Sequence, residues 1–394
     1  MTSTGPTICL VAGEESGDQL GSELMKALDA KLGEETRYCG VGGERMTNLG
    51  LSSFFDISDV SVMGLSAVLA RLPLIIRRVY QTVDAIVAAD PAVLVIIDSP
   101  DFTHNVARRV RKRAPHIPIV GYVSPSVWAW RPGRAKNMSA YVDQLLALLP
   151  FEPEVHKKLG GPPTHYVGHP LVENVGDLRP AGNERAPLLK DNGVLVVLPG
   201  SRRSEIDRLL PDFGKTVAHL KKEMPGLEVL LPAVGHLEQR IRQEVKSWEF
   251  QPKVLTGLDE KQAAFRRAHA ALAASGTVSL ELALSGVPMV VAYKVDWFFR
   301  RLKELNRLFK LANVDSFVLP NIILGNRAIP AFLDEEVDPE VLARKLIGLL
   351  TDGPERQFQL SELSRLDDLM RLPDGHSQKD AAVGIVIRTM NSAR

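Results

Sequence analysis

A chain of 394 residues is long for a single hydrophobic core, so its length favours two domains. Hydrophobic residues make up 45% of it and charged residues 24%, which is typical of a soluble globular protein and excludes collagen-like and wholly disordered chains. The net charge of +1 argues against a nucleic-acid-binding surface that spans the whole protein. Two cysteines, Cys9 and Cys39, are too few for a disulfide scaffold or a cysteine-based metal site.

The amino-terminal residues do not form a signal peptide, because no basic segment precedes a long apolar run there. No later apolar run approaches the roughly 18 residues that a membrane span needs. We therefore expect a cytoplasmic protein in a reducing compartment, whose contacts with membranes or anions are local.

The first half alternates continuous apolar runs with helical patterns, which predicts a parallel sheet that helices cover on both faces. The expected strands are 7–13, 36–43, 92–98, 117–125 and 144–150, and the expected helices are 18–32 and 106–113.

A segment dense in Gly and Pro, 160–192, indicates a domain boundary. We place the first domain at 1–175, the second at 176–375 and a C-terminal helix at 376–394. The second half repeats the pattern of the first, with expected strands at 194–201, 227–234, 253–257, 270–277 and 287–293 and helices at 261–268 and 278–285. The expected fold is therefore α/β, with two doubly wound Rossmann-like domains and a ligand-binding cleft at the carboxyl ends of their strands.

Three loops that follow strands combine glycine with hydroxyl residues and open helices, at 12–21, 198–206 and 274–281. Exposed N–H groups at a helix start bind anions, and either Arg202 or Arg203 in the second loop could hold a phosphate in a bidentate manner. The alternative is that serines cap these helices and the arginines are solvated. Two such loops in the second domain favour a nucleoside diphosphate.

Asp98 ends the apolar run of a predicted buried strand, where a carboxylate faces the ligand crevice and partial desolvation favours its use as a general base. The alternative is that Asp98 or Asp101 caps the following helix. No two aspartates are separated by a single residue, so the DxD metal motif of many sugar transferases is missing. We expect no metal and no cofactor.

The stretch 61–83 has no acidic residue before Asp84 and combines large apolar side chains with Arg71, Arg77 and Arg78. Such an amphipathic segment can lie in an anionic lipid interface. A core-packing helix with a solvated basic rim is the alternative. Trp128 and Trp130 are either core aromatics or a platform for lipid or sugar.

Ten motifs, spread over nearly the whole chain, closely resemble those of the lipid-A-disaccharide synthases. They are GEESGDQLG (13–21), GVGGERM (40–46), VMGL (62–65), IDSPDF (97–102), YVSPSVWAWR (122–131), LLPFE (148–152), YVGHPL (166–171), LPGSRRSEI (198–206), SGTVSLELAL (275–284) and LPNIILGNR (319–327). The resemblance implies an inverting, metal-independent GT-B glycosyltransferase with two facing Rossmann-like domains. It implies the transfer of a diacylglucosamine from UDP-2,3-diacylglucosamine to 2,3-diacylglucosamine 1-phosphate, which gives a β-1,6-linked disaccharide 1-phosphate and UDP in lipid A biosynthesis.

The same resemblance implies roles for individual residues. Asp98 is the expected base for the acceptor 6-hydroxyl. The residues expected to contact substrate or nucleotide are Ser16, Gly17, Asp18, Arg202, Ser275, Gly276, Thr277, Glu281 and Asn321. The residues expected to face the membrane or acyl chains are Val62, Met63, Leu69, Arg71, Leu72, Leu74, Ile75, Arg77 and Arg78. Because the substrates are lipids, we expect a peripheral protein on the cytoplasmic face of the inner membrane that contacts anionic lipids and no nucleic acid.

The chain departs from the family pattern at Ser66, Ala67 and 295–299. Two other functions remain as alternatives: a GT-B UDP-sugar epimerase, which would not need the apolar and basic stretch, and a non-enzymatic two-domain solute-binding protein, which is normally exported. Acyl-chain length and kinetic order stay open, as does whether the C-terminal helix packs within the monomer or exchanges with a partner in a homodimer.

Overall fold

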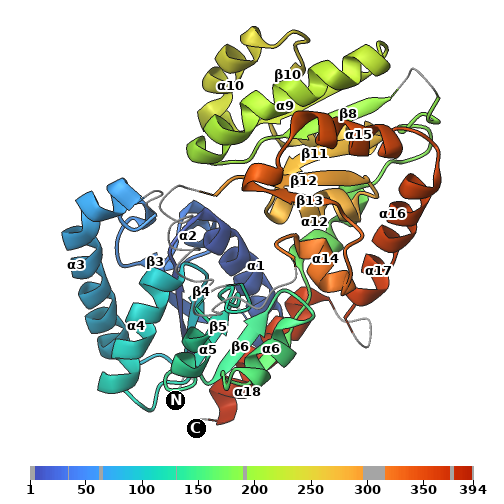
Figure 1. Ribbon diagram of the computed structural model, residues 1–394. Helices are drawn as coiled ribbons and strands as arrows, with labels where there is room; N and C mark the ends of the chain where they lie inside the picture. Colours follow the sequence, from blue (N-terminus) through green and yellow to red (C-terminus); the bar gives the residue numbers. More distant parts are fainter. Residues whose placement is uncertain are drawn as a thin grey trace. The chain divides into compact units, whose positions relative to one another are not determined.

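The computed structural model describes residues 5–33, 35–61, 65–129, 131–189, 193–295, 316–372 and 377–392, with the backbone alone at 65–69. The chain forms two compact units (Figure 1). The first unit comprises Met1–His169 together with Leu372–Arg394, and the second is the continuous segment Pro170–Arg371.

The first unit contains a seven-stranded parallel sheet in the order β3-β2-β1-β4-β5-β6-β7. Its central strands are continuous apolar runs because both faces are covered, and all five residues of β4 are buried. The strands are β1 (Thr7–Ala12), β2 (Arg37–Val41), β3 (Ser52–Ser53), β4 (Val93–Ile97), β5 (Ile119–Tyr122), β6 (Gln144–Ala147) and β7 (Thr164–Tyr166).

Helices cover both faces of this sheet. Apolar residues three and four apart on α1 and α18 pack on one face, and those on α3 and α4 pack on the other. The neighbouring helices α3 and α4 lie side by side in Figure 1. The helical segments are α1 (Glu15–Leu32), α2 (Glu44–Asn48), η1 (Ile57–Asp59), α3 (Leu65–Ala89), α4 (Pro100–Arg113), α5 (Gly133–Met138), α6 (Glu152–Lys158) and α18 (Gln378–Ser392).

The second unit contains a six-stranded parallel sheet in the order β10-β9-β8-β11-β12-β13. The central strands β8 and β11 are buried along their whole length. The strands are β8 (Val194–Leu198), β9 (Glu228–Ala233), β10 (Lys253–Thr256), β11 (Ala270–Ala274), β12 (Met289–Tyr293) and β13 (Ala331–Leu333).

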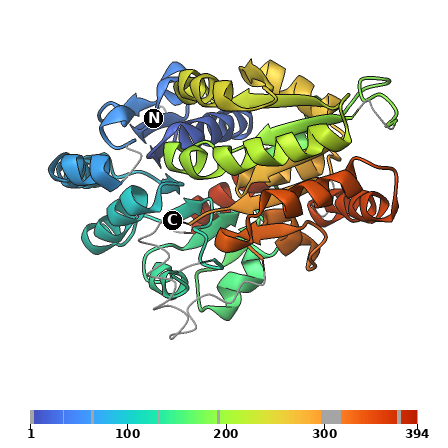
Figure 2. The same cartoon turned by 45° about the horizontal axis from the view of Figure 1, so that its top comes forward.

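On one face of the second sheet, α9 and α15 lie side by side over a common apolar core (Figure 2). The helical segments of this unit are α7 (Pro170–Glu173), α8 (Val175–Leu178), α9 (Arg203–Glu223), η2 (Gly235–Leu237), α10 (Glu238–Glu244), η3 (Val245–Ser247), α11 (Leu258–Arg267), α12 (Thr277–Leu284), α14 (Leu319–Leu324), η4 (Asp334–Glu336), α15 (Pro339–Leu349), α16 (Pro354–Ser364) and α17 (Leu366–Leu369).

Both sheets have the strand order of the dinucleotide-binding Rossmann fold, in which the order reverses beside the first strand of each unit. The predicted pair of doubly wound domains is therefore confirmed. The reversal lies between β1 and β4 in the first unit and between β8 and β11 in the second. Ligands of such sheets bind outside the carboxyl ends of the strands at this point, so each unit has its own candidate binding region at this edge.

Candidate active site

Asp98 lies at the strand reversal of the first unit, where it directly follows β4. Ala12 and Ile97 are register partners, so the ends of β1 and β4 are adjacent. The loop after β1 opens α1, and Ser16 in its first turn donates a hydrogen bond from Oγ to Asp98 Oδ2 at 3.4 Å. The structure thus brings together two residues that the sequence places 82 positions apart.

The backbone at Asp98 adopts an uncommon conformation. Asp98 has φ +50° and Ser99 has φ +42°, a left-handed region that costs non-glycine residues on the order of 1–3 kcal/mol each. Three hydrogen bonds hold the turn: the Asp98 N–H donates to the Tyr122 carbonyl at 2.9 Å, the Thr103 hydroxyl donates to the Asp98 carbonyl at 2.6 Å, and the Ser99 N–H donates to Asp98 Oδ1 at 2.8 Å. Such strain is concentrated at functional sites, where the surrounding structure over-determines it.

Neither Asp98 nor Asp101 caps α4. The N-cap residue is Ser99, and it makes no side-chain capping hydrogen bond. Asp101 lies in the first turn, is exposed, and forms an ion pair with Arg134 at 2.9 Å. One carboxylate oxygen of Asp98 therefore accepts a hydrogen bond within the turn, from the Ser99 N–H, and the other accepts one from the exposed Ser16 hydroxyl.

Two glycines allow α1 to approach the end of β4. A Cβ atom on Gly13 would lie 2.5 Å from Ser99 Cβ, and one on Gly17 would lie 3.3 Å from the Ile97 carbonyl oxygen. Gly17 therefore acts here through its lack of a side chain, which lets the α1 start reach the Asp98 turn.

The side chain of Asp18 is directed toward the start of α2. It is buried, and its oxygens accept hydrogen bonds from the N–H groups of Gly43 (2.7 Å), Arg45 (3.0 Å) and Met46 (3.1 Å). Both carboxylate oxygens are thus occupied by backbone donors, and this residue fixes the loop after β2.

A buried polar cluster lies beside the β5 end. Glu152 Oε1 accepts from the Trp128 indole N–H at 3.3 Å and Oε2 accepts from the Leu149 N–H at 3.0 Å. Burial raises the pKa of Glu152 to about 7, and the hydrogen bonds from Leu149 and Trp128 oppose that rise. His156 Nε2 lies 2.8 Å from Ser124 Oγ, and burial lowers the pKa of this imidazole to about 4. Glu152 and His156 were not among the predicted site residues, since the segment EPEVHKK resembles an exposed charged helix.

The strand reversal of the second unit borders a cavity of about 640 Å³. This volume is within the ordinary range for sites that bind small molecules. Five of the residues predicted to hold the nucleotide line it: Arg202, Ser275, Gly276, Thr277 and Glu281. Among the described residues, no group of three or more His, Cys, Asp or Glu side chains could hold a metal ion.

A carboxylate already occupies part of the α9 start. The buried Glu205 accepts hydrogen bonds at Oε2 from the N–H groups of Ser201 (3.1 Å) and Arg202 (3.2 Å). Gly200, with φ +113°, makes room for it, because a Cβ there would lie 2.5 Å from Glu205 Oε2. The Arg202 side chain is 71% exposed and pairs with Glu205 Oε1 at 3.2 Å. The guanidinium thus lies at the cavity while Glu205 takes two of the donors that the sequence assigned to a phosphate.

The start of α12 is different, because no side chain caps it. Its N-cap residue Gly276 has φ +153° and open space on the side where a Cβ would stand. Ser275 donates from Oγ to the Phe317 carbonyl at 2.8 Å, which fixes the loop. Glu281, one turn into the helix, forms an ion pair with Lys261 at 2.5 Å, and both line the cavity. The N–H groups at this uncapped helix start lie beside the cavity, and the anion site that the glycine-rich pattern indicates there stays a prediction.

Asn321 borders another cavity of the second unit, one of about 450 Å³. Its buried amide makes a pair of hydrogen bonds with Ile329, in which Nδ2 donates to the carbonyl and Oδ1 accepts from the N–H, both at 2.9 Å. This residue fixes the segment before β13, and the structure does not place it among the lining residues of the larger cavity.

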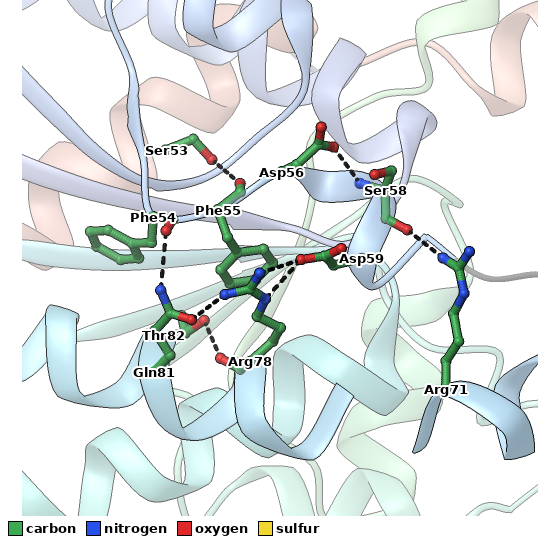
Figure 3. Close-up of polar contacts among 10 residues, drawn as sticks. All are labelled: Ser53, Phe54, Phe55, Asp56, Ser58, Asp59, Arg71, Arg78, Gln81 and Thr82. Atoms are coloured by element: carbon green, nitrogen blue, oxygen red, sulfur yellow. Dashed lines mark hydrogen bonds and ion pairs between the residues drawn. The ribbon is translucent and has the colours of Figure 1, made fainter. Parts of the chain in front are cut away.

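The predicted membrane-facing stretch forms α3, and polar contacts tie that helix to residues 53–59 (Figure 3). Arg78 forms an ion pair with Asp59 at 2.5 Å and lies over the Phe55 ring at 4.8 Å. Arg71 donates to the Ser58 carbonyl at 3.1 Å. The Arg78 charge is therefore largely neutralised within the unit, whereas Arg77 is exposed.

An apolar stripe runs along the exposed side of α3. Leu72, Ile76 and Tyr80, spaced four residues apart, are 42%, 49% and 51% exposed. Ile76 and Tyr80 were not among the residues predicted to face the membrane. Of those that were, Ile75 packs against the core and Leu74 is half-buried. Val62, Met63, Trp130 and the side chain of Leu69 lie outside the described residues. No helix in the described part of the chain is long and apolar enough to cross a bilayer.

Known proteins resemble this chain over nearly its full length. Residues 8–382 match the family model described as Lipid-A-disaccharide synthetase. The lipid-A-disaccharide synthase of Nitrobacter hamburgensis is 50% identical over 391 residues, which cover 98% of this chain and 96% of that protein. That of Rhodospirillum centenum is 39% identical over 395 residues, with the same coverage.

Two solved structures share the fold at low identity. Acinetobacter baumannii MurG is 13% identical with a TM-score of 0.58, over 97% of this chain and 99% of that chain. A putative UDP-N-acetylglucosamine 2-epimerase from Listeria monocytogenes is 13% identical with a TM-score of 0.59, over 99% of this chain and 98% of that chain. From the family match and the relatives at 39–50% identity over nearly the full length, the chain belongs to the lipid-A-disaccharide synthase family.

Proposed function

We propose that this protein is a lipid-A-disaccharide synthase that transfers 2,3-diacylglucosamine from its UDP derivative to 2,3-diacylglucosamine 1-phosphate. The observation that carries the proposal is the pairing of a full-length family match with Asp98 at the strand reversal of the first unit. The product is the β-1,6-linked disaccharide 1-phosphate of lipid A biosynthesis, and UDP is released.

In the proposed reaction, Asp98 accepts the proton of the acceptor 6-hydroxyl as that oxygen bonds to the anomeric carbon. The bond from the anomeric carbon to the diphosphate breaks on the opposite face, so the configuration inverts from α to β. A base on one side and neutralisation of the leaving group on the other are what an oxocarbenium-like centre requires. The Ser16 hydroxyl, 3.4 Å from Asp98 Oδ2, orients the carboxylate.

The UDP group is proposed to lie in the 640 Å³ cavity of the second unit. The uncapped start of α12 at Ser275, Gly276 and Thr277 receives the diphosphate, and the exposed Arg202 guanidinium donates to it. Glu281 accepts from the ribose hydroxyls. Asn321 supports this unit indirectly, by holding the segment before β13.

One assay tests the function. Purified protein is incubated with the diacylated donor and acceptor, and UDP and a tetraacyl disaccharide phosphate are sought by mass spectrometry. A parallel incubation with UDP-N-acetylglucosamine tests for an epimer. Formation of the disaccharide by the wild type, with at least about a hundredfold slower formation by Asp98→Asn under the same conditions, supports the proposal. Epimer formation without disaccharide would replace it with the epimerase function.

The exposed side of α3 is proposed to dock on the cytoplasmic face of the inner membrane. Leu72, Ile76 and Tyr80 supply the apolar contact, and Arg77 beside them faces anionic headgroups. A basic side chain near such a surface contributes about 1 kcal/mol, but the ion pair with Asp59 reduces that contribution for Arg78.

Co-sedimentation with vesicles that contain anionic lipid tests this docking surface. We expect Leu72→Ser/Ile76→Ser and Arg77→Ser each to weaken binding, and salt to weaken binding by the wild type. Arg78→Ser should instead lower the thermal midpoint, because it removes the contacts to Asp59 and Gln81. If wild type and all variants bind the vesicles equally, and salt does not change that binding, the role of α3 is purely structural.

A further inference from the structure

The loop 123–129 follows β5 and begins beside Asp98, because the Tyr122 carbonyl accepts the Asp98 N–H at 2.9 Å. Its first residue, Val123, has φ +77°, a conformation that is rare for a β-branched side chain. With Asp98 and Ser99, this makes three left-handed residues at the ends of two neighbouring strands. A loop in this state needs strong external anchors, because the free backbone would relax to another conformation.

One anchor is the carboxyl group of Glu152 in the first turn of α6. It is 3% exposed and binds the Trp128 indole N–H of the loop at 3.3 Å, while the Leu149 N–H fills its other oxygen at 3.0 Å. The Trp128 ring packs edge-to-face on Phe151 with centroids 5.5 Å apart. No cation pairs with Glu152 among the residues that the structure describes. A buried carboxyl group without a cation destabilises a fold, so its presence here points to a use other than stability.

The second anchor is His156, four residues further along the same face of α6. Its Nε2 lies 2.8 Å from Ser124 Oγ, and the Ser124 hydroxyl donates to the Pro125 carbonyl at 3.1 Å. Within the described part of the chain, Nδ1 is buried without a hydrogen-bond partner. A proton on Nδ1 would leave a buried N–H donor unsatisfied, whereas a proton on Nε2 leaves only an acceptor unsatisfied. We therefore assign the proton to Nε2, which donates it to Ser124 Oγ. The backbone of Gly161 lies close against this ring, because a Cβ atom on Gly161 would lie only 2.5 Å from His156 Nδ1.

We propose that Glu152 and His156 are positioning residues of the glycosyl transfer, which hold the loop 123–129 as the wall against which the acceptor sugar meets Asp98. The proposal rests on the proposed function. Glu152 acts through Trp128 and His156 acts through Ser124, so neither needs to touch the substrate. Two hydrogen bonds from one helix face fix both ends of the loop, and its strained first residue adjoins the base.

The test combines hydrogen exchange with steady-state kinetics. Trp128→Phe removes the indole donor while it keeps the ring on Phe151, and Glu152→Gln removes the charge at nearly constant shape. Trp248→Phe, a half-buried tryptophan of the second unit, is the matched control. We expect both loop variants to exchange the amides of Val123, Val127 and Ala129 at least about tenfold faster than wild type, since each loses a hydrogen bond to a charged group.

In the transfer assay, the same two variants should lose about ten- to a hundredfold in kcat/KM for the acceptor, with the affinity for UDP unchanged. The double variant should lose no more than Glu152→Gln alone, because the carboxyl group acts through the indole. The control should match wild type in all three measurements.

Three results would overturn the proposal: unchanged loop exchange in both variants, faster exchange with unaltered acceptor kinetics, or a double variant whose losses are additive. A general loss of folding would instead weaken UDP binding in the second unit as well. A wild-type protein that makes no disaccharide would refute the proposed function, while the exchange data would still show whether Glu152 fixes the loop.

Discussion

Replacing Asp98 by Asn separates the chemistry of this residue from its place in the fold. Asn tolerates the left-handed φ of +50° better than most residues do. Its amide oxygen can still accept the Ser99 N–H, which donates to Asp98 Oδ1 at 2.8 Å in the native turn. The backbone hydrogen bonds to Tyr122 and Thr103 do not involve the side chain. The variant should therefore keep its thermal midpoint within a few degrees of wild type.

The expected loss of turnover is about 10²- to 10⁴-fold, the usual effect of losing a general base. At about 1.4 kcal/mol per factor of ten, this equals about 3 to 5 kcal/mol of transition-state stabilisation. The affinity for UDP should not change, because the proposed UDP cavity belongs to the second unit. Disaccharide formation at saturating donor and acceptor, followed by mass spectrometry, measures kcat directly.

Asp101→Asn is the appropriate comparison, because Asp101 lies three residues away, is 85% exposed on its side chain, and pairs only at the surface with Arg134. Loss of an exposed ion pair of this kind costs at most about 1 kcal/mol of stability. If Asp98→Asn folds normally and keeps near wild-type turnover while Asp101→Asn loses it, the proton acceptor is Asp101 and the reasoning from the strand reversal fails.

Three further predictions concern the UDP cavity, the buried carboxyl group and the turn before α1. Arg202→Ala should weaken UDP binding by about 1.5 to 3 kcal/mol in calorimetry with chelator present. Arg203 does not line the cavity, so Arg203→Ala should leave the affinity for UDP unchanged. Equal affinities of the two variants would refute the phosphate contact proposed for Arg202. Burial raises the pKa of Glu152 from 4.5 to about 7. Between pH 4.5 and 7 the folded protein therefore retains a proton that the unfolded chain has released. As pH rises through this window, the free energy of unfolding should fall by up to about 3 kcal/mol because of this group. Glu152→Gln should remove that contribution in urea titrations, and parallel pH profiles for the two proteins would contradict it. Gly13→Ala should cost about 1–3 kcal/mol of stability and lower kcat, because the added Cβ would displace Ser99 and with it Asp98. A variant with native stability and turnover would show that the turn is not tightly packed.

Much of the fold was predictable from the sequence because buried parallel strands leave a clear pattern. The run VLVII of β4 is apolar throughout, and all five residues are buried. The edge strands β3, β7 and β13 have only two or three residues, and none of their side chains is fully buried, so no apolar run marks them. Helix starts were less accurate: α4 begins at Pro100, whereas the pattern indicated 106, since proline suits a first helical position that apolar spacing does not reveal.

The candidate site was predictable where chemistry follows a strand end, as at Asp98 and Ser275. The contacts of buried polar side chains that accept hydrogen bonds from backbone N–H groups were not predictable. Glu205 takes two N–H groups at the α9 start, and Asp18 takes three at the α2 start, yet in the sequence both resemble ordinary helical acids. Burial of a carboxylate depends on donors from other elements, and those contacts exist only once the chain has folded.

The last helix, α18, has a consequence for how the protein is made. Ala382, Val383, Ile385, Val386 and Met390 belong to the same apolar core as β1 and α1, and Gln378 donates to the Tyr122 hydroxyl at 3.1 Å. The first unit therefore cannot complete the apolar core on one face of its sheet until residues 378–392 have left the ribosome, whereas the second unit is one uninterrupted segment. Domains generally complete folding from the amino terminus during synthesis. Here the order is reversed, because the half with the proposed base keeps apolar surface uncovered until the second unit and then residues 378–392 have been made.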